Sequence, residues 1–316
     1  MELMSSSCDV LCNGSVEIEK STSSTLHYIA ENVTKAVKTI AKQRNLETTV
    51  VFDHVAPIDI CVFGRSGIGK STLIKAITNL DIPESPQIDH VTEVVTEVTT
   101  YIGALKVRFW DTKGIDNWLD IDIIDNMFNE MNKLNVKPLF IIYCAATNGR
   151  VDSDIAAGIL TRFQRQNIPI CYVITNIYAA SDEQLEQQIE GGRRIMKRVF
   201  GSSPKSNGDL YYTYENTCTA NEGYCKEGIL IGVNSCVFSN RMGTQPLFNI
   251  HELMDFLAGA LKDEDFTKFV ALTMANRDFW DRAKDAIRTR VLRITDTLDS
   301  WKIKTGSFIK RLFGRE

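Results

Sequence analysis

Short apolar runs alternate with amphipathic segments along most of this chain. Four of the runs are partly β-branched and too short for helices, which predicts buried strands over residues 58–63, 138–146, 168–175 and 229–238. Between them, apolar residues recur at three- and four-residue spacing, which predicts helices over residues 116–134, 153–165, 181–200 and 250–261. This alternation favours an α/β fold with a mainly parallel sheet and helices on both faces.

One pair of segments predicts a hairpin instead. Residues 94–102 are rich in Val, Thr and Tyr, Gly103 supplies a turn, and apolar residues then alternate with Lys106 and Arg108 up to Asp111. One strand of the sheet is therefore expected to be antiparallel. Residues 201–228 lack such a pattern, and we expect a loop with an aromatic cluster there.

The two ends of the chain differ from its middle. Residues 1–20 are Ser-rich without periodicity, which predicts a disordered tail, and residues 21–47 carry the apolar spacing of an amphipathic helix. Residues 265–316 lack strand signals, and apolar residues recur every seven positions from Trp280. This basic amphipathic extension is typical of a helix that contacts a membrane surface or an acidic partner, or of one that packs back on the domain.

Composition narrows the class of protein. Of the 316 residues 44% are apolar and 24% charged, as in ordinary globular proteins, and the formal net charge of −4 argues against a general nucleic-acid-binding role. The longest apolar run, residues 139–146, is too short to span a bilayer, and no secretory signal is present, so we expect a cytoplasmic protein.

The positions of the cysteines indicate a role in core packing more than in metal binding. Cys61, Cys144, Cys171 and Cys236 fall in predicted strands, where a thiol behaves as a small buried apolar group. The cysteines in the polar segments lack the paired spacing and nearby histidines of a zinc site.

The first predicted strand leads into the motif with the most specific chemistry. The sequence Gly-Arg-Ser-Gly-Ile-Gly-Lys-Ser-Thr joins this strand to a helical segment, which is the pattern of a phosphate-binding loop. The loop residues are Gly64, Arg65, Ser66, Gly67, Ile68, Gly69, Lys70, Ser71 and Thr72. Such a loop aims backbone N–H groups at an anion, with the lysine at the β- and γ-phosphates and the following hydroxyl on Mg²⁺.

The hairpin extends this resemblance to a family. It ends in Asp111-Thr112-Lys113-Gly114, and together with the loop this resembles the translation-factor-related P-loop GTPases, in the form of their Era, septin and immunity-associated branches. The likeness covers roughly residues 55–262 and implies a P-loop NTPase G domain. It also implies that Asp111 holds Mg²⁺ through water and that the Gly114 N–H contacts the γ-phosphate.

The same resemblance implies a threonine that ligates Mg²⁺ only in the triphosphate state. Asp111 lies eight residues after the Gly103 turn, so its partner on the other strand of the hairpin lies near residue 95. Thr92 fits this position and Thr96 is the alternative. Either one is also a residue that strand surfaces favour.

Two positions depart from the family pattern. The base-specificity motif Asn/Thr-Lys-x-Asp is replaced by Thr175-Asn176-Ile177-Tyr178, so the lysine and the aspartate are both missing. The Tyr178 ring can stack on a base, and Asp182 either supplies the lost carboxylate or caps a helix. Asn234 and Ser235 resemble the last base-contacting loop. The preference for guanine over adenine rests on the combination of phosphate loop and hairpin, because this motif does not supply it.

The other departure concerns catalysis. Ile115 follows Gly114, where Ras-like members carry a glutamine that orients water, and an aliphatic side chain cannot do this. The hypothesis is slow GTP hydrolysis, with Lys70, Thr92 and Gly114 as catalytic residues, accelerated by self-association or an effector protein.

These predictions divide the chain into a tail (1–20), a helix (21–47), a G domain (48–264) and a helical extension (265–316). The predicted function is a Mg²⁺-dependent GTPase switch that binds GTP and GDP. Two alternatives stay open, a P-loop protein that uses ATP and a catalytically degenerate GTPase-like interaction module.

Overall fold

The computed structural model describes residues 57–65, 67–79, 88–91, 95–102, 105–112, 121–147, 153–217, 225–240, 243–273 and 276–290. These residues belong to two compact units, one formed by Ala56–Ala275 and a second to which residues 276–290 belong. The predicted tail and helix over residues 1–47 lie outside the described residues, as does most of the predicted C-terminal extension.

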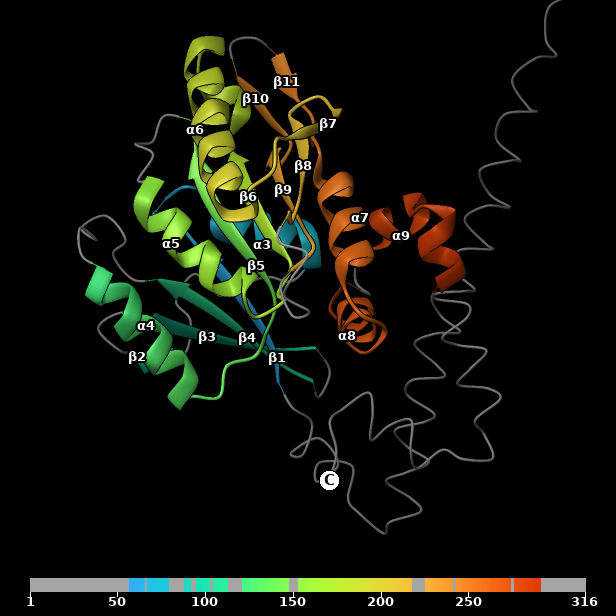
Figure 1. Ribbon diagram of the computed structural model, residues 1–316. Coiled ribbons are helices and arrows are strands. Elements are labelled where there is room, and N and C mark those ends of the chain that lie inside the picture. The colour runs from blue at the N-terminus through green and yellow to red at the C-terminus, as the bar shows by residue number, and fades with distance from the viewer. Residues whose placement is uncertain are drawn as a thin grey trace, which may run out of the picture. The chain divides into compact units, whose positions relative to one another are not determined.

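The larger unit is built on a nine-stranded sheet in the order β2-β3-β4-β1-β5-β6-β9-β8-β7 (Figure 1). The strands are β1 (Ile58–Phe63), β2 (Ile88–Val91), β3 (Val95–Ile102), β4 (Leu105–Thr112), β5 (Pro138–Ala146), β6 (Ile170–Thr175), β7 (Lys205–Gly208), β8 (Tyr211–Glu215) and β9 (Glu227–Gly232). The central strands β4, β1, β5, β6 and β9 are parallel, and β3 pairs antiparallel with β4. The predicted fold class, a mainly parallel sheet with an antiparallel hairpin, is confirmed.

The prediction of a loop over residues 201–228 is wrong in part. β7 and β8 form an antiparallel hairpin that extends the sheet beyond β9. β7 is exposed along its whole length and reads Lys-Ser-Asn-Gly, so it carries none of the apolar alternation that identifies a strand. Its pairing depends on the neighbouring strand β8, whose residues are Tyr-Tyr-Thr-Tyr-Glu.

The predicted strand over residues 229–238 is also shorter than expected. β9 ends at Gly232, and the chain then forms a separate two-stranded hairpin of β10 (Phe238–Asn240) and β11 (Gly243–Gln245). Cys236 therefore lies in a connecting segment and is exposed, which corrects its predicted core position. Cys61, Cys144 and Cys171 are buried in their strands as predicted.

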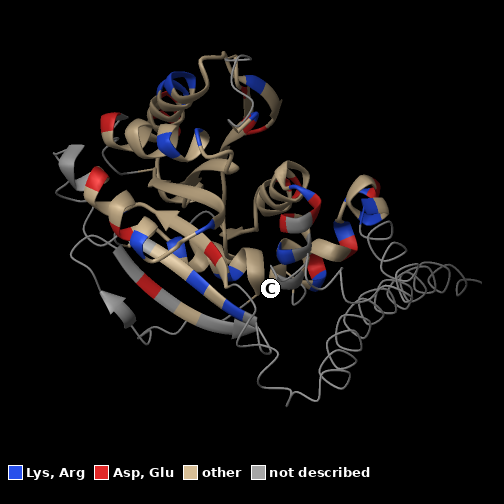
Figure 2. Cartoon of the chain, turned by 60° about the horizontal axis from the view of Figure 1, so that its bottom comes forward, with Lys and Arg blue, Asp and Glu red and all other residues tan. Residues whose placement is uncertain are grey.

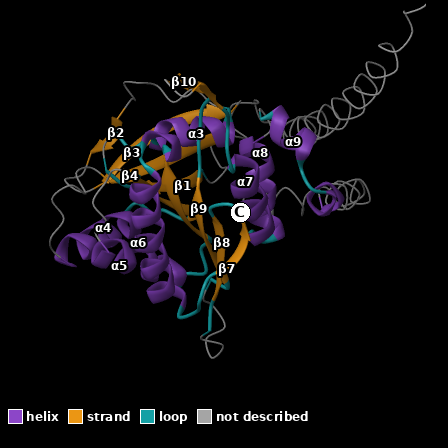
Figure 3. Ribbon diagram, turned by 90° about the horizontal axis from the view of Figure 1, so that it is seen from above, coloured by secondary structure: helices purple, strands orange, loops and turns teal. Residues whose placement is uncertain are grey.

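Helices cover both faces of the sheet (Figure 3). One face carries α4 (Ile121–Lys133), α5 (Ser153–Gln164) and α6 (Asp182–Phe200), and the other carries α3 (Lys70–Thr78), α7 (Ile250–Ala260) and α8 (Asp263–Thr273). The predicted capping box of α6 is present, because Ser181 Oγ accepts from the Gln184 N–H and Gln184 Oε1 accepts from the Ser181 N–H. None of the helices in the described residues is long and apolar enough to span a bilayer.

The smaller unit contributes α9 (Arg277–Arg282) and a helical stretch over residues 285–290. Asn276 caps α9 by accepting from the Phe279 N–H. Trp280 and Ile287, which belong to the predicted seven-residue repeat, are both buried. Ala283 adopts an extended ψ of 138°, so the helix is interrupted between these two residues.

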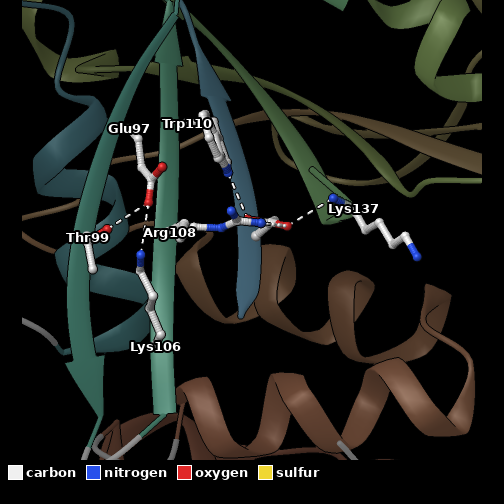
Figure 4. Close-up of polar contacts among 7 residues, drawn as sticks. Glu97, Thr99, Lys106, Arg108, Trp110 and Lys137 are labelled. Atoms are coloured by element: carbon white, nitrogen blue, oxygen red, sulfur yellow. Dashed lines mark hydrogen bonds and ion pairs between the residues drawn. The ribbon is translucent and has the colours of Figure 1, made fainter. Parts of the chain in front are cut away.

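A buried carboxylate joins three strands at the end where β1 begins (Figure 4). Asp59 is 2% exposed and accepts four hydrogen bonds: two from the Arg108 guanidinium (2.6 and 2.8 Å), one from Trp110 Nε1 (2.8 Å) and one from the Lys137 N–H (2.9 Å). These donors come from β4 and from the residue just before β5. The cluster therefore fixes the position of β1 relative to both of its neighbours.

The neutral variant Asp59→Asn is expected to lower the free energy of unfolding by about 3–5 kcal/mol, because it removes the carboxylate partner of the half-buried Arg108 guanidinium and places an amide donor among the donors of the cluster. Urea titration followed by circular dichroism measures this loss. Asp154→Asn is the matched control, since it removes the same charge from an exposed pair with Arg198. That control should change stability by less than about 0.5 kcal/mol. Equal stabilities for the two variants would show that the Asp59 cluster does not hold the strands.

Candidate functional site

The candidate site lies where the parallel strands end. β1 ends at Phe63, and the loop from Gly64 to Gly69 then leads into α3 at Lys70. β5 and β6 run parallel to β1, so their carboxyl ends, at Ala146 and Thr175, meet the loop at the same edge of the sheet. Ligands of open α/β sheets bind at this edge.

The backbone of the loop has a conformation that favours glycine. Gly64, Gly67 and Gly69 have φ values of 137°, 75° and 92°. A Cβ on Gly64 would lie 2.4 Å from the Cys144 carbonyl oxygen and 2.4 Å from Ile68 Cδ1, so this position has no room for a side chain. A chain that turns this tightly can aim successive N–H groups at one anion.

Lys70 is held against the loop by the loop itself. Its Nζ donates to the carbonyl oxygens of Gly64 and Arg65, each at 2.8 Å. An ammonium has three N–H groups, so it can hold the loop and reach a phosphate oxygen at the same time. Gly69 caps α3 without a side-chain hydrogen bond, and the first-turn N–H groups of a helix are donors for an anion.

One threonine attaches the loop to β6, and a second links the end of β5 to the segment after β6. The Thr175 hydroxyl, from the end of β6, contacts the carbonyl oxygens of Ile68 (2.5 Å) and Ala145 (3.3 Å). The Thr147 hydroxyl, just after β5, donates to the Asn176 carbonyl at 3.2 Å. Thr175, predicted as a nucleotide-binding residue, is 1% exposed and contacts the loop. Thr147 was not among the predicted residues, although its position directly after a buried strand was a usable signal.

The segment after β6 places a polar and an aromatic residue beside the loop. Asn176 has a left-handed φ of 57°, and its side chain is 3.7 Å from where a Cβ on Gly69 would lie. The Tyr178 ring packs edge-on against Phe248, with ring centroids 6.4 Å apart and planes at 71°. Asp182 is exposed in the first turn of α6, beside the capping box. Phe248 had no recognisable signal in the sequence, because it lies far along the chain.

The Asn234 side chain shapes the loop after β9. It is 1% exposed, and its Nδ2 donates to the carbonyls of Cys236 (2.8 Å) and Pro246 (2.6 Å). Its backbone also exchanges two hydrogen bonds with Phe248. The amide therefore brings both ends of the β10–β11 insertion together, and Ser235 follows at the surface of the same loop, half-buried.

The hairpin places the backbone of Asp111 and Thr96 close to the strand that leads into the loop. Thr96 pairs with Asp111 across β3 and β4, which confirms the register expected for the end of the hairpin. Asp111 in turn pairs with Val62, two residues before Gly64. The structure describes only the backbone at Thr96 and Asp111, and Ser66, Thr92 and Gly114 lie outside the described residues.

The chemistry of the described site suits an anion more than a metal held by protein alone. Within the described ranges no group of three or more His, Cys, Asp or Glu side chains is arranged to hold a metal ion. Ser71 is exposed in the first turn of α3 and offers a hydroxyl oxygen. A magnesium ion takes one or two protein oxygens together with substrate phosphates, so the available groups fit it.

Comparison with known proteins shows that part of the chain is similar to a family. Residues 59–189 match the family described as 50S ribosome-binding GTPase. The tRNA modification GTPase MnmE of Zymomonas mobilis is 30% identical over 100 residues, which make up 31% of this chain and 23% of that protein. The matching segment thus spans less than a quarter of the curated relative.

Solved structures give distant matches. The elongation factor SelB of Methanococcus maripaludis, in complex with the GTP analogue GppNHp, is 18% identical with a TM-score of 0.31, over 47% of this chain and 29% of that one. Toc33 of Arabidopsis thaliana, in complex with GDP and Mg²⁺, is 10% identical with a TM-score of 0.32, over 55% of this chain and 70% of that one.

Replacing Thr175 with valine is expected to weaken nucleotide binding about tenfold, because the Ile68 carbonyl loses its partner and the loop its support. Thr273→Val is the matched control: its buried hydroxyl donates to the Phe269 carbonyl in α8 at 2.8 Å. Both variants should lose about 1–3 kcal/mol of stability, and Thr175→Val alone should lose affinity. Calorimetric titration and thermal unfolding separate the two effects. A similar loss of affinity in both variants would contradict a specific role for Thr175.

Proposed function

We propose that this chain, whose residues 59–189 match a family of GTPases, binds GTP with Mg²⁺ and hydrolyses it to GDP as a molecular switch. One observation carries the proposal: the loop is already folded around Lys70, with glycines at positive φ and a helix that begins directly after it. A site prepared in this way favours binding of phosphate groups.

The residues of the loop would hold the triphosphate. Backbone N–H groups between Gly64 and Thr72 would surround the β-phosphate, and Lys70 would contact the β- and γ-phosphates. Mg²⁺ would be held by Ser71 and by Asp111 through water, with Thr92 as the further ligand and Thr96 as the alternative. Bound there, the ion neutralises charge on the phosphate oxygens.

The base would lie beyond the loop, between the segments after β6 and β9. Asn176 and Tyr178 occupy the positions where the family motif has lysine and aspartate, so guanine would be recognised without that carboxylate. The Tyr178 ring, held by Phe248, supplies an apolar surface, and Ser235 supplies a hydroxyl on the opposite segment. Preference for guanine is the part of this proposal that rests most on family membership.

Hydrolysis would follow in-line attack of water on the γ-phosphate, with Lys70, Thr92 and the Gly114 N–H stabilising the transferred group. Ile115 cannot orient the water, so turnover by the isolated chain would be slow. Loss of the γ-phosphate would release the segments that contain Thr92 and Gly114, which is the basis of a switch. A cytoplasmic location and membrane contact through the C-terminal extension stay predictions.

Titration calorimetry with GTP, GDP and ATP, each with Mg²⁺, tests the proposed ligand. The wild-type chain should bind GTP and GDP more tightly than ATP, and Lys70→Ala should lose at least about a hundredfold in GTP affinity. Lys75→Ala, an exposed lysine further along α3, serves as the control and should bind normally. Tighter ATP binding would favour the ATP-using alternative, and no binding of any nucleotide would favour the degenerate module.

The dependence of turnover on protein concentration tests the catalytic part. Because Ile115 leaves water without an orienting side chain, GTP hydrolysed per chain per minute should rise with chain concentration as copies associate and complete the site. Phosphate release at dilute and concentrated protein, with Lys70→Ala as a blank, measures this. A turnover per chain that does not change with protein concentration would contradict the self-association hypothesis. A turnover no higher than that of the Lys70→Ala blank would favour a module that binds nucleotide without hydrolysing it.

A further inference from the structure

The residue at the last position of the base-specificity motif is held by contacts from a distant segment. Tyr178 lies in the single 3₁₀ turn Ile177–Ala179 just after β6, and its ring packs edge-on against Phe248, with ring centroids 6.4 Å apart. The Phe248 backbone exchanges two hydrogen bonds, of 3.2 and 3.1 Å, with Asn234 in the loop after β9. The segments after β6 and β9 therefore share one aromatic contact. A held aromatic ring thus stands where the family motif has a carboxylate.

The polar side chains named for the base site are electrically neutral. The Asn176 carboxamide lies against the phosphate loop, with its Oδ1 and Nδ2 each 3.7 Å from where a Cβ on Gly69 would lie. The Asn176 carbonyl accepts from the Thr147 hydroxyl at 3.2 Å, which holds its backbone. Ser235 and Tyr178 add hydroxyl groups, and both residues are half-buried. Amides and hydroxyls can each donate or accept a hydrogen bond, so none of these groups requires an N–H donor on the base.

Two exposed aspartates flank these segments. Asp182 lies in the first turn of α6. Asp209 lies in the turn between β7 and β8, which is tied to the end of β9 because Asn249 Nδ2 donates to the carbonyls of Asp209 (2.8 Å) and Gly232 (3.0 Å). Neither carboxylate has a hydrogen bond or ion pair within the described part of the chain. A recognition group needs its rotamer held by packing and hydrogen bonds, so neither aspartate is a prepared substitute for the missing acid.

We propose that the nucleotide site stacks the base on the Tyr178 ring and does not select the 2-amino group of guanine, so that it binds inosine nucleotides as well as guanosine nucleotides. Such binding rests on the proposed function, since it concerns the base of the same nucleotide. It goes beyond that function by adding a second class of substrate. Tyr178 would be the residue that sets this specificity, with Phe248 holding its ring.

The chemistry of the two bases makes this specificity measurable. Hypoxanthine, the base of inosine, is guanine without the 2-amino group. Stacking on an aromatic ring tolerates this difference, because both bases offer a π-face. A carboxylate that accepts from the 2-amino group loses that hydrogen bond with hypoxanthine, which costs about tenfold or more in affinity. The ratio of the two affinities therefore distinguishes recognition by a carboxylate from recognition by an aromatic ring.

Titration calorimetry of the full chain with Mg²⁺ and GDP, inosine diphosphate (IDP) or pyrophosphate tests the proposal. We expect GDP and IDP to bind within about threefold of each other. Tyr178→Ala should weaken both about tenfold through loss of stacking, and leave pyrophosphate, which needs only the phosphate loop, unchanged. Tyr178→Phe keeps the ring and should bind both nucleotides normally. Tyr212→Ala, which removes a half-buried tyrosine from beside Arg193 on α6, is the matched control and should bind all three ligands normally.

Several results would overturn the proposal. A preference for GDP over IDP beyond that margin would show that the site recognises the 2-amino group, and loss of the preference in Asp182→Asn or Asp209→Asn would identify the aspartate responsible. If Tyr178→Ala weakened pyrophosphate as much as the nucleotides, the tyrosine would have a structural role and not a stacking one. Unchanged nucleotide binding in that variant would place the base elsewhere. A chain that binds none of the three ligands would overturn the proposed function itself, so the two failures are distinguishable.

Discussion

The close approach of the chain at Gly64 to the end of β5 is the constraint on which the site depends. The Cys144 carbonyl and the Ile68 side chain occupy the space where a side chain at residue 64 would lie. Only glycine therefore fits where the loop passes the end of β5, and Thr175, at the end of β6, contacts the Ile68 carbonyl. Lys70 completes the arrangement by bonding to the carbonyls at the start of the loop. Contacts from β5 and β6 thus hold the loop that follows β1 in its observed shape.

At the opposite end of the strands, the Asp59 contacts set the register of β4 against β1. Asp59 gathers donors from β4 and from the start of β5, and so it fixes how far β4 is displaced along β1. That displacement decides where β4 ends, with Asp111 beside Val62. Elsewhere, basic and acidic residues are interspersed along the described chain (Figure 2), and ion pairs such as Arg198–Asp154 are exposed. The Asp59 cluster differs from these pairs because its carboxylate is buried and contacts both neighbours of β1.

The sequence allowed those parts of the molecule to be predicted that depend on local pattern. The phosphate loop, the hairpin to Asp111 and the capping box of α6 each consist of neighbouring residues whose spacing carries the signal. Counting along the hairpin placed the partner of Asp111 near residue 95, and the structure pairs Asp111 with Thr96.

The parts that escaped prediction depend on contacts between distant segments. β7 is polar throughout and forms a strand because β8 offers it an edge. Asn234 donates to Pro246, Phe248 packs on Tyr178, and Cys236 is exposed because the chain leaves the sheet at Gly232. The residues around these positions carry no sequence pattern that identifies the partner in each contact. The role of Thr175 in holding the loop likewise emerges from its distance to Ile68.

A crystal structure of the chain with Mg²⁺ and a nonhydrolysable GTP analogue would test the central claim most directly. The account predicts the β- and γ-phosphates inside the Gly64–Gly69 loop, with Lys70 Nζ in contact with them and Mg²⁺ on the side of Ser71 and Asp111. The loop itself should keep the backbone conformation described above, because its glycines already adopt it. An empty loop, or an analogue bound elsewhere on the domain, would contradict the account.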